Sequence, residues 1–530
     1  MLSACAPAHG ERREPARTRL ALLHVADLHS HLFPERVTLD ATDAERGLGG
    51  ASGDTVSVGG AARIATALDR ERARTDVAVT LDAGDVFEGT AVYTLFGGVP
   101  EMRVVDALGV DAQALGNHDF SPGPARLASL RRYAPGDLLL AANLGAEAAG
   151  LAEPSVLVER GGLRVRIVGV GRSPDAAPDV AASAAVVQQV VDASRDADVI
   201  VVLSHLGTDL DDELVPLTTG VDVVLGGHTH DVTAPQHAVQ DCGAKLAKSR
   251  GCRSRVVPVV HSGAYGRYVG RVSVLVSTEP QDVAGSGRRS AVVEVRPSLV
   301  PITAGVVERP DVLTLLEPYR RAMATAGLGR PIAFAPRGVS RAAVRGGDSA
   351  LGDFVTHALR VTAGAELALI NTTGIRDDLP AGELTVEDVF RVLPFDDRLV
   401  RVHVSGRQLL DVVEHIRSDS CGRGRTTQAE VDGGTFVLGC GGAGSAEVRV
   451  AGHPVNMSGA YAVATASFLT GAGQWLGHID EANTEDLGLL RDAVLGVLAE
   501  LPPCGGDAGS ILPCLDALAG AGHDGRITWR

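Results

Sequence analysis

The chain has 530 residues, and its 65 acidic against 49 basic side chains give a formal net charge of −16. This balance provides no basic field that would recruit DNA or RNA polymers, so a small anion would have to be bound locally. The length exceeds that of one typical domain, and the apolar content of 45% is normal for globular proteins. No run of about eighteen apolar residues occurs, so no segment is expected to span a membrane.

Residues 1–18 are expected to form a flexible tether. Leu2, Ser3, Ala4 and Cys5 resemble a bacterial lipobox, whose cysteine is lipidated after signal cleavage, and the polar stretch APAHGERREPART follows them. The charged and apolar regions of a signal peptide do not precede this motif. We therefore expect that the start of the sequence is truncated or wrongly assigned, and that the natural product is an extracytoplasmic lipoprotein, periplasmic or on the cell surface, anchored through Cys5.

Five apolar, β-branched-rich runs follow over about two hundred residues, and each ends in a short polar cluster. The runs LALLHVA, VAVTL, DAQAL, DVIVVL and VDVVL predict buried strands, which places each cluster at a strand's carboxyl end. In α/β sheets the loops at these ends converge on one crevice, so distant residues come within reach of one ligand. The clusters ADLHSH, LDAGDVFEG, LGNHD, LSHLG and GGHTHD supply Asp27, His29, Asp85, Asn117, His118, His205, His228 and His230.

The residue types in these clusters indicate a metal site. Aspartate and neutral histidine suit Zn, Mn, Fe or Co, and the absence of cysteine argues against a structural Cys-rich zinc site. A carboxylate such as Asp85 can bridge two cations about 3.5 to 4 Å apart, and such a pair clamps phosphoryl oxygens. A lone histidine such as His205 is more often a capped or solvated loop residue, but five clusters in order favour a two-metal phosphoesterase site.

This constellation resembles the calcineurin-like metallophosphoesterases, and within them the 5'-nucleotidase family, whose bacterial members also hydrolyse UDP-sugars. The resemblance implies an α/β fold, with a four-layer β-sandwich flanked by helices and a second α/β domain at the carboxyl end. It also implies that His118 is the catalytic histidine. The family pattern places Asp27, His29, Asp85 and His230 at a first metal site, and Asp85, Asn117, His205 and His228 at a second.

One departure from the family lies beside His118. The family motif GNHEFD has an Asp three residues after the histidine, which orients the imidazole. This chain reads GNHDFSPG and has Ser121 at that position, while Asp119 occupies the family's Glu position. Adjacency in sequence does not make Asp119 a geometric substitute, so the orienting partner of His118 is left open.

A domain boundary is expected where VVERPDVLTLLEPYRRAMATAGL predicts a linking helix. Beyond it ELALINTTGIR predicts a strand and turn, TVEDVFRVL a helix, RLVRVHV a strand, SGRQLLDVVEHI a helix with Ser405 as N-cap, and AYAVATASFL a strand. The expected organisation is a tether at 1–18, a catalytic domain at 19–304, a linker helix at 305–330 and a substrate-binding domain at 331–530.

The carboxyl-terminal half also resembles the substrate domain of the 5'-nucleotidase family. In the family two Phe side chains sandwich the base, and Arg and Asn groups hold the nucleotide. Thr372 and Thr373 replace two glycines of the family's NGGGIR, and Gln474 stands where the family has an Asp that bonds the ribose hydroxyls. From composition alone, such Phe residues would be core and such Arg residues solvated. The substrate residues that the motifs imply are Arg345, Asn371, Arg376, Phe395, Phe468 and Gln474.

Six of the seven cysteines fall into close pairs, which predicts three local disulfides, although six cysteines allow fifteen connectivities. The alternative is a set of free buried thiols in a cytosolic protein. The pairs are Cys242 with Cys252, Cys421 with Cys440, and Cys504 with Cys514.

The expected function is hydrolysis of nucleoside 5'-monophosphates, with UDP-sugars as further substrates and two divalent cations of unidentified kind as cofactors. Two alternatives stay open. A 2',3'-cyclic-nucleotide phosphodiesterase with 3'-nucleotidase activity is favoured by the altered NTTGIR and by Gln474. A surface nucleotide-binding protein that has lost turnover is favoured by Ser121 in place of the orienting Asp.

Overall fold

The computed structural model describes residues 16–174, 176–233, 237–285, 288–441, 446–471, 473–504, 512–515 and 525–530. Cys5 and most of the expected tether lie outside the described residues. The chain packs as two compact units that are discontinuous in sequence, and the expected domain boundaries remain a prediction. The first unit comprises Met1–Phe33, Gly59–Phe87 and Glu101–Leu313; the second comprises Pro34–Val58, Glu88–Pro100 and Thr314–Arg530.

Two six-stranded sheets form the centre of the first unit. In one sheet the neighbouring strands β1, β4, β5 and β6 run parallel, and in the other β8, β9, β10 and β12 do. The first sheet has the order β14(Arg288–Pro301), β13(Tyr268–Val283), β1(Arg17–Val25), β4(Val77–Asp82), β5(Ala112–Ala114) and β6(Leu139–Leu140). The second has the order β11(Ala238–Gln240), β12(Val256–His261), β10(Val223–Gly226), β9(Val199–Ser204), β8(Leu163–Val170) and β7(Ser155–Arg160).

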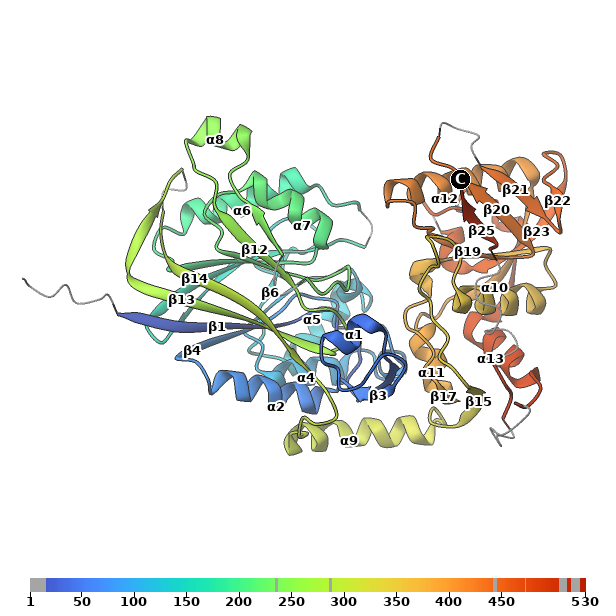
Figure 1. Cartoon of the computed structure of the whole chain (residues 1–530), viewed down its shortest axis with the longest axis horizontal. Coiled ribbons are helices and arrows are strands. Elements are labelled where there is room, and N and C mark those ends of the chain that lie inside the picture. The colour runs from blue at the N-terminus through green and yellow to red at the C-terminus, as the bar shows by residue number, and fades with distance from the viewer. Residues whose placement is uncertain are drawn as a thin grey trace, which may run out of the picture. The chain divides into compact units, whose positions relative to one another are not determined.

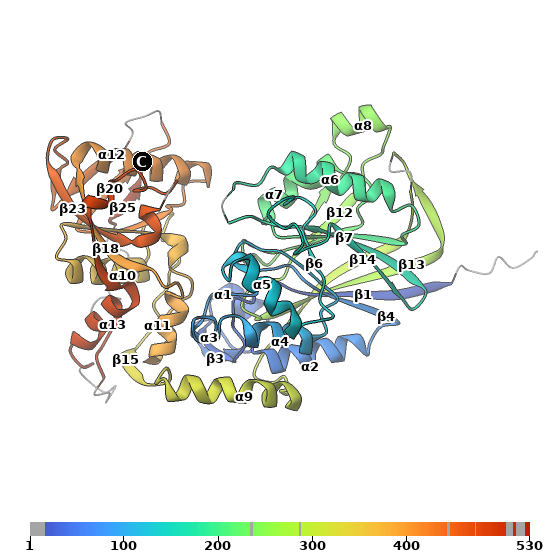
Figure 2. The ribbon, with the colours of Figure 1, turned by 180° about the vertical axis from the view of Figure 1, so that it is seen from behind.

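The inner faces of the two sheets share one apolar core, to which Leu22, Leu81, Ile167 and Leu225 contribute fully buried side chains. Helices cover the outer faces: α6(Val180–Ala193) and α7(Thr208–Leu214) lie on one side, and α2(Ala61–Arg72) and α4(Val99–Leu108) on the other (Figures 1 and 2). This arrangement confirms the predicted four-layer α/β sandwich.

All five predicted strands are present in the first unit, as β1, β4, β5, β9 and β10. Because β1, β4 and β5 are parallel, and β9 and β10 are parallel, the loops after their carboxyl ends can meet at one edge of the sandwich.

The second unit is built on a five-stranded sheet in the order β19(Ala429–Asp432), β16(Leu367–Asn371), β23(Ala460–Ala466), β18(Arg398–Ser405) and β24(Thr484–Leu489). Helices α10(Ala350–Ala363) and α13(Leu490–Glu500) pack on one core, and α12(Gly406–Gly422) packs on another. The expected N-cap is confirmed, because the Ser405 hydroxyl accepts the Gln408 amide in a capping box.

Further elements complete the second unit. A four-stranded sheet has the order β22(His453–Pro454), β21(Glu447–Val450), β20(Gly434–Leu438) and β25(Ile527–Trp529). The remaining strand pairs are β15(Pro331–Ala335) with β17(Gly382–Thr385) and β2(Glu35–Thr38) with β3(Thr55–Val58). The helices are α1(Ala41–Glu45), α3(Ala91–Phe96) and α11(Val386–Val392); the expected linking helix is α9(Pro310–Thr325), which crosses the unit boundary.

The β2–β3 hairpin belongs to the second unit by its polar contacts as well as by its packing. The Arg36 guanidinium donates to the carbonyls of Ala381 and Glu383, and Glu35 pairs with the buried Arg391 at 3.3 Å. A segment from the amino-terminal part of the chain is therefore an integral piece of this unit.

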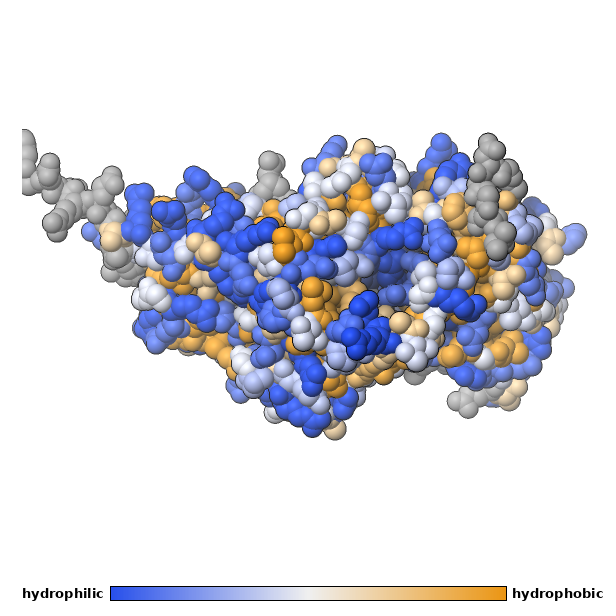
Figure 3. Space-filling model, turned by 90° about the horizontal axis from the view of Figure 1, so that it is seen from below, coloured by the Kyte–Doolittle hydropathy of each residue, from blue (hydrophilic) through white to orange (hydrophobic). Residues whose placement is uncertain are grey.

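Three disulfides join Cys242 to Cys252, Cys421 to Cys440, and Cys504 to Cys514, as predicted. Among the described residues, no helix combines the length and the apolar character that crossing a membrane would require. On the face seen in Figure 3, hydrophilic residues alternate with small hydrophobic patches, as is usual for a protein surface.

Candidate metal centre

Five of the seven predicted metal ligands lie in sharp bends of the loops that follow the strands. Asp27, His29, Asp85, His228 and His230 all have positive φ angles, between 45° and 83°. Non-glycine residues rarely adopt this left-handed conformation, and when they do they often lie at functional sites. Five of the twelve described non-glycine residues with positive φ are therefore residues that the sequence marks as ligands.

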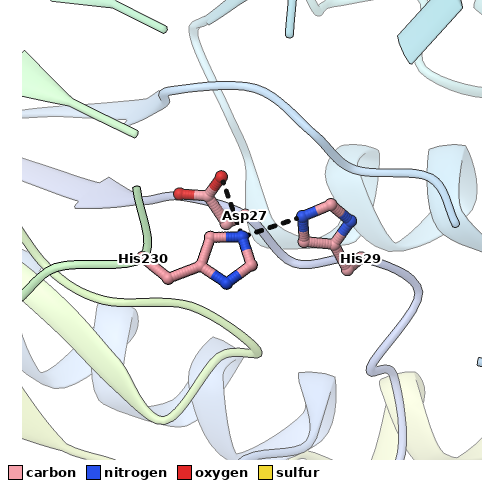
Figure 4. A group of neighbouring side chains, drawn as sticks. All are labelled: Asp27, His29 and His230. Carbon is pink, nitrogen blue, oxygen red and sulfur yellow. Dashed lines mark hydrogen bonds and ion pairs between the residues drawn. The ribbon is translucent and has the colours of Figure 1, made fainter. Parts of the chain in front are cut away.

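A first cluster brings together Asp27, His29 and His230, whose candidate ligand atoms lie within 4.8 Å of one another (Figure 4). The Nε2 atom of His230 lies 3.1 Å from Nε2 of His29 and 3.7 Å from Oδ1 of Asp27. Two imidazole nitrogens and a carboxylate oxygen that face one point form a donor set suited to a divalent cation.

A second cluster contains Asp85, His205 and His228, again with candidate ligand atoms within 4.8 Å. The Nε2 atom of His205 lies 3.0 Å from Oδ2 of Asp85. The predicted ligand Asn117 lies just before the short helix His118–Phe120, and its Oδ1 is buried without a hydrogen-bond partner among the described residues. A buried carbonyl oxygen of this kind fits a cation ligand, since buried polar atoms otherwise find partners.

Asp85 belongs to the second cluster and also lies next to the first. Its Oδ2 is 3.7 Å from His29 Nε2 on one side and 3.0 Å from His205 Nε2 on the other, while its Oδ1 accepts the His118 backbone N–H at 2.7 Å. His29, Asp85 and His118 form a third group of neighbouring ligand atoms. The carboxylate is therefore placed to bridge two cations and, through the backbone, to fix the position of His118.

Backbone carbonyls set the orientation of two of the imidazoles. Nδ1 of His29 lies 3.1 Å from the Phe87 carbonyl, and Nδ1 of His205 lies 2.6 Å from the Ala83 carbonyl. These contacts fix the ring orientations so that each Nε2 faces Asp85, as the outer contacts of a metal-ligating histidine do.

The ionisable groups of the centre perturb one another. Burial raises the pKa of Asp27 to about 7. Burial also acts to raise the pKa of Asp85, but the nearby His205, His118 and His29 hold that pKa well below its ordinary range. Burial alone would lower the pKa of His205, whereas Asp85 and Asp27 raise it to about 10. Such mutual shifts are typical of a functional site.

Asp119 has a different role from the family's orienting Asp. Its fully buried carboxylate accepts the backbone N–H groups of Asp85 at 2.9 Å, Val86 at 2.9 Å and Gly116 at 2.8 Å. It therefore fastens the loop of Asp85 to the loop that carries His118. The sequence shows only an acidic residue beside His118 and gives no sign of these distant amides.

Tyr265 was also not predicted. Its ring stacks on His31 at 4.2 Å and meets the His230 ring edge-on at 5.2 Å, and its N–H donates to the Asp27 carbonyl at 2.8 Å. The one signal that could have found it is an aromatic residue among glycines in a chain with only 3% aromatic residues.

The second unit brings some of the predicted substrate residues together. The Arg376 guanidinium lies 5.9 Å from the Phe395 ring centroid. The Asp397 carboxylate, two residues after Phe395, accepts the Phe468 N–H at 3.1 Å, so the two Phe-bearing loops are tied together. Phe468 is 49% exposed, which excludes a core role.

The other predicted substrate residues lie on loops of the same unit. The Asn371 amide donates to the hydroxyl of Thr373, a residue that replaces a family glycine, at 2.6 Å. Arg345 is exposed on a bend with φ of 54°, and Gln474 is half-buried after the short helix Ser467–Thr470. Contacts between these side chains and a nucleotide stay a prediction.

An α/β sandwich with two Asp and His clusters at the strand ends, linked by the Asp85 carboxylate, defines a metallophosphoesterase. Residues 20–232 match the family model of calcineurin-like phosphoesterases, and residues 324–478 match that of the 5'-nucleotidase C-terminal domain. The chain belongs to the 5'-nucleotidase family of these metal-dependent phosphoesterases.

Named relatives agree with this placement. A probable 5'-nucleotidase of Treponema pallidum is 27% identical over 482 residues, which cover 80% of this chain and 78% of the relative. The 5'-nucleotidase of Bos taurus is 26% identical over 430 residues, with 75% and 71% covered. The crystal structure of a 5'-nucleotidase precursor from Thermus thermophilus has a TM-score of 0.77 at 26% identity, and 96% of this chain and 99% of that one are covered.

Proposed function

We propose that this protein is a 5'-nucleotidase that converts nucleoside 5'-monophosphates to nucleosides and phosphate, with UDP-sugars as further substrates. The observation that carries the proposal is the pair of ligand clusters joined by Asp85. The relatives named 5'-nucleotidase support the choice of substrate class.

Seven side chains would hold two divalent cations. We assign Asp27, His29 and His230 to the first site, Asn117, His205 and His228 to the second, and Asp85 to both. When bound, the cations would supply Lewis acidity that activates water and neutralises the phosphoryl oxygens.

His118 is the proposed catalytic histidine. Its backbone N–H is anchored on Asp85 Oδ1, and its ring centroid lies 5.0 Å from that of His29 in an edge-on arrangement. From this position the imidazole would stabilise charge on the attacked phosphoryl group and give a proton to the departing ester oxygen.

Substrate would be held by residues of the second unit. The exposed Phe468 and the half-buried Phe395 offer ring faces on which a base can stack. The remaining proposed contacts are Arg345, Asn371, Arg376 and Gln474, whose guanidinium and amide groups suit phosphate and ribose oxygens.

We also propose an extracytoplasmic location, which the three disulfides support because such bonds persist in oxidising compartments. Lipidation of Cys5 is a further proposal. Intact-mass analysis of the membrane fraction should find an acylated Cys5, and an unmodified protein recovered from the cytoplasm would contradict both statements.

A substrate panel tests the proposed activity. AMP, UDP-glucose, 3'-AMP and 2',3'-cyclic AMP would be compared at equal concentration with added Mn²⁺ or Zn²⁺, and we expect the highest kcat/KM for AMP. A preference for the 3' or cyclic ester would replace the proposal with a cyclic-nucleotide phosphodiesterase. Inactivity on every ester despite two bound metals would indicate a binding protein.

A further inference from the structure

Asp211 is a buried carboxylate close to the second cluster but outside the predicted ligand set. It lies in α7 and is 0% exposed, and both of its oxygens are used. Oδ1 accepts the Ser204 hydroxyl at 2.5 Å, and Oδ2 accepts His261 Nε2–H at 2.9 Å. Two buried neighbours, contributed by two different strands, are therefore cross-linked through one side chain.

Ser204 connects this network to His205. It is the last residue of β9, and its Oγ also accepts the Leu206 N–H at 3.2 Å. The Ser204 hydroxyl therefore contacts the backbone on the far side of His205, which fixes the backbone of that ligand. A change in the position of Ser204 would be passed directly to the His205 imidazole.

His261 connects the network to His228. It ends β12 and is the register partner of Gly226, the last residue of β10. A Cβ atom on Gly226 would lie 2.2 Å from His261 Nε2 and 2.6 Å from Asp211 Oδ2, so the carboxylate and imidazole press against this glycine. This close approach explains why only glycine fits at position 226. His228 follows two residues later, so the contact fixes the backbone that leads into this ligand.

We propose that Asp211 is a positioning residue that holds His205 and His228, and through them the second metal site; the inference rests on the proposed two-metal function. The network fixes the ends of β9, β10 and β12 relative to one another. Metal affinity depends on such outer contacts because they fix the direction of each ligand lone pair.

The first cluster contacts the second where the His228 N–H donates to the Asp27 carboxylate at 2.9 Å, but its other backbone contacts lie outside the Asp211 network. The Asp27 N–H donates to the Gly84 carbonyl, and the His29 N–H donates to the Asp85 carbonyl, each at 2.9 Å. The loop of His230 is fastened at Asp231, whose carboxylate accepts the hydroxyl of Thr208, the first residue of α7, at 2.7 Å, a bond that does not use the Asp211 side chain. Loss of the Asp211 network should therefore weaken one metal site more than the other.

Asp211→Asn in the full chain tests the proposal, because an amide cannot accept hydrogen bonds from both Ser204 and His261. Asp222→Asn is the matched control. Asp222 is also buried, and it accepts the Ile200 N–H at 2.9 Å near the amino end of β9, away from the cluster. The measurements are Mn²⁺ bound per chain at defined free Mn²⁺, and AMP hydrolysis across the same titration.

Wild type and Asp222→Asn should bind two Mn²⁺ per chain. In Asp211→Asn one of the two sites should weaken by about 10- to 100-fold, and added Mn²⁺ should restore most of kcat. Ser204→Ala removes the bonds to Asp211 and Leu206 but keeps the one between Asp211 and His261, so it should give a smaller loss of affinity at the same site. This second variant tests the proposal if Asp211→Asn does not fold.

Unchanged affinity at both sites in a folded Asp211→Asn, or in Ser204→Ala if Asp211→Asn does not fold, would overturn the inference. Equal metal loss in Asp222→Asn would also overturn it, since the cause would then be general destabilisation. If wild type itself bound fewer than two Mn²⁺ per chain, the result would contradict the proposed two-metal function, on which the role of Asp211 rests.

Discussion

At the scale of single residues, Asp119 shows how a carboxylate can serve the centre without touching a ligand atom. Three backbone N–H groups, those of Asp85, Val86 and Gly116, converge on it in a fully buried position. A buried amide left without an acceptor costs about 1–3 kcal/mol. Asp119 therefore stabilises the loop geometry on which both Asp85 and His118 depend.

Asp119→Asn should lower kcat/KM for AMP by about 10- to 100-fold, because the amide replaces one acceptor oxygen and shifts the bridging Asp85. Ser121→Ala is the control, since Ser121 is exposed and should tolerate the change within about twofold. Steady-state kinetics at saturating Mn²⁺ checks both variants. Equal activity of Asp119→Asn and wild type would refute this role for Asp119.

At the scale of elements, the cap of α12 allows a quantitative test of a sequence prediction. The Ser405 hydroxyl accepts the Gln408 backbone N–H at 3.3 Å, and the Ser405 N–H donates to the Gln408 side-chain oxygen at 2.8 Å. Ser405→Ala should reduce the free energy of unfolding by about 1 kcal/mol. The exposed Ser418 of the same helix is the matched control, since Ser418→Ala should be neutral or slightly stabilising. Urea denaturation compares the two, and equal effects would contradict the capping role.

The strands and helices were the most predictable part of the fold. Apolar runs that end in polar clusters identified β1, β4, β5, β9 and β10, because the residues of a buried strand and those of a ligand loop differ sharply in type. Sequence order could not show that segments 34–58 and 88–100 pack with residues 314–530. That packing depends on contacts such as the one between Glu35 and Arg391, which are more than 300 residues apart in the chain.

The candidate centre was predictable to the same degree and for a similar reason. The aspartates and histidines of the clusters reveal their role as metal ligands in the sequence, because their residue types and positions after strands indicate it. The sequence does not reveal the roles of Asp119, Asp211 and Tyr265, because their partners are backbone amides, a hydroxyl and aromatic rings supplied by distant segments. The spacing of residues along the chain does not predict such contacts.

At the scale of the whole molecule, the stability of the second unit should depend on pH through Glu430. Burial raises the pKa of this carboxyl from 4.5 to about 8, although Ser349 donates to both of its oxygens. Because the folded pKa lies above the unfolded one, this group's contribution is fully present below pH 4.5 and is lost as pH rises through about 8.

Calorimetry across this range would compare wild type with Glu430→Gln, which stays neutral. The difference between the Tm of the variant and the Tm of wild type should shift in favour of the variant as pH rises. A difference in Tm that does not change with pH would show that Glu430 does not titrate between the folded and unfolded states.

We propose that seven side chains from five strand ends hold two cations bridged by Asp85. Anomalous diffraction from crystals saturated with Mn²⁺ would locate both cations and their ligands. We predict two peaks about 3.5–4 Å apart, with Asp27, His29 and His230 at one, Asn117, His205 and His228 at the other, and Asp85 at both. A single peak, or none, at these strand ends in the Mn²⁺-saturated protein would contradict it.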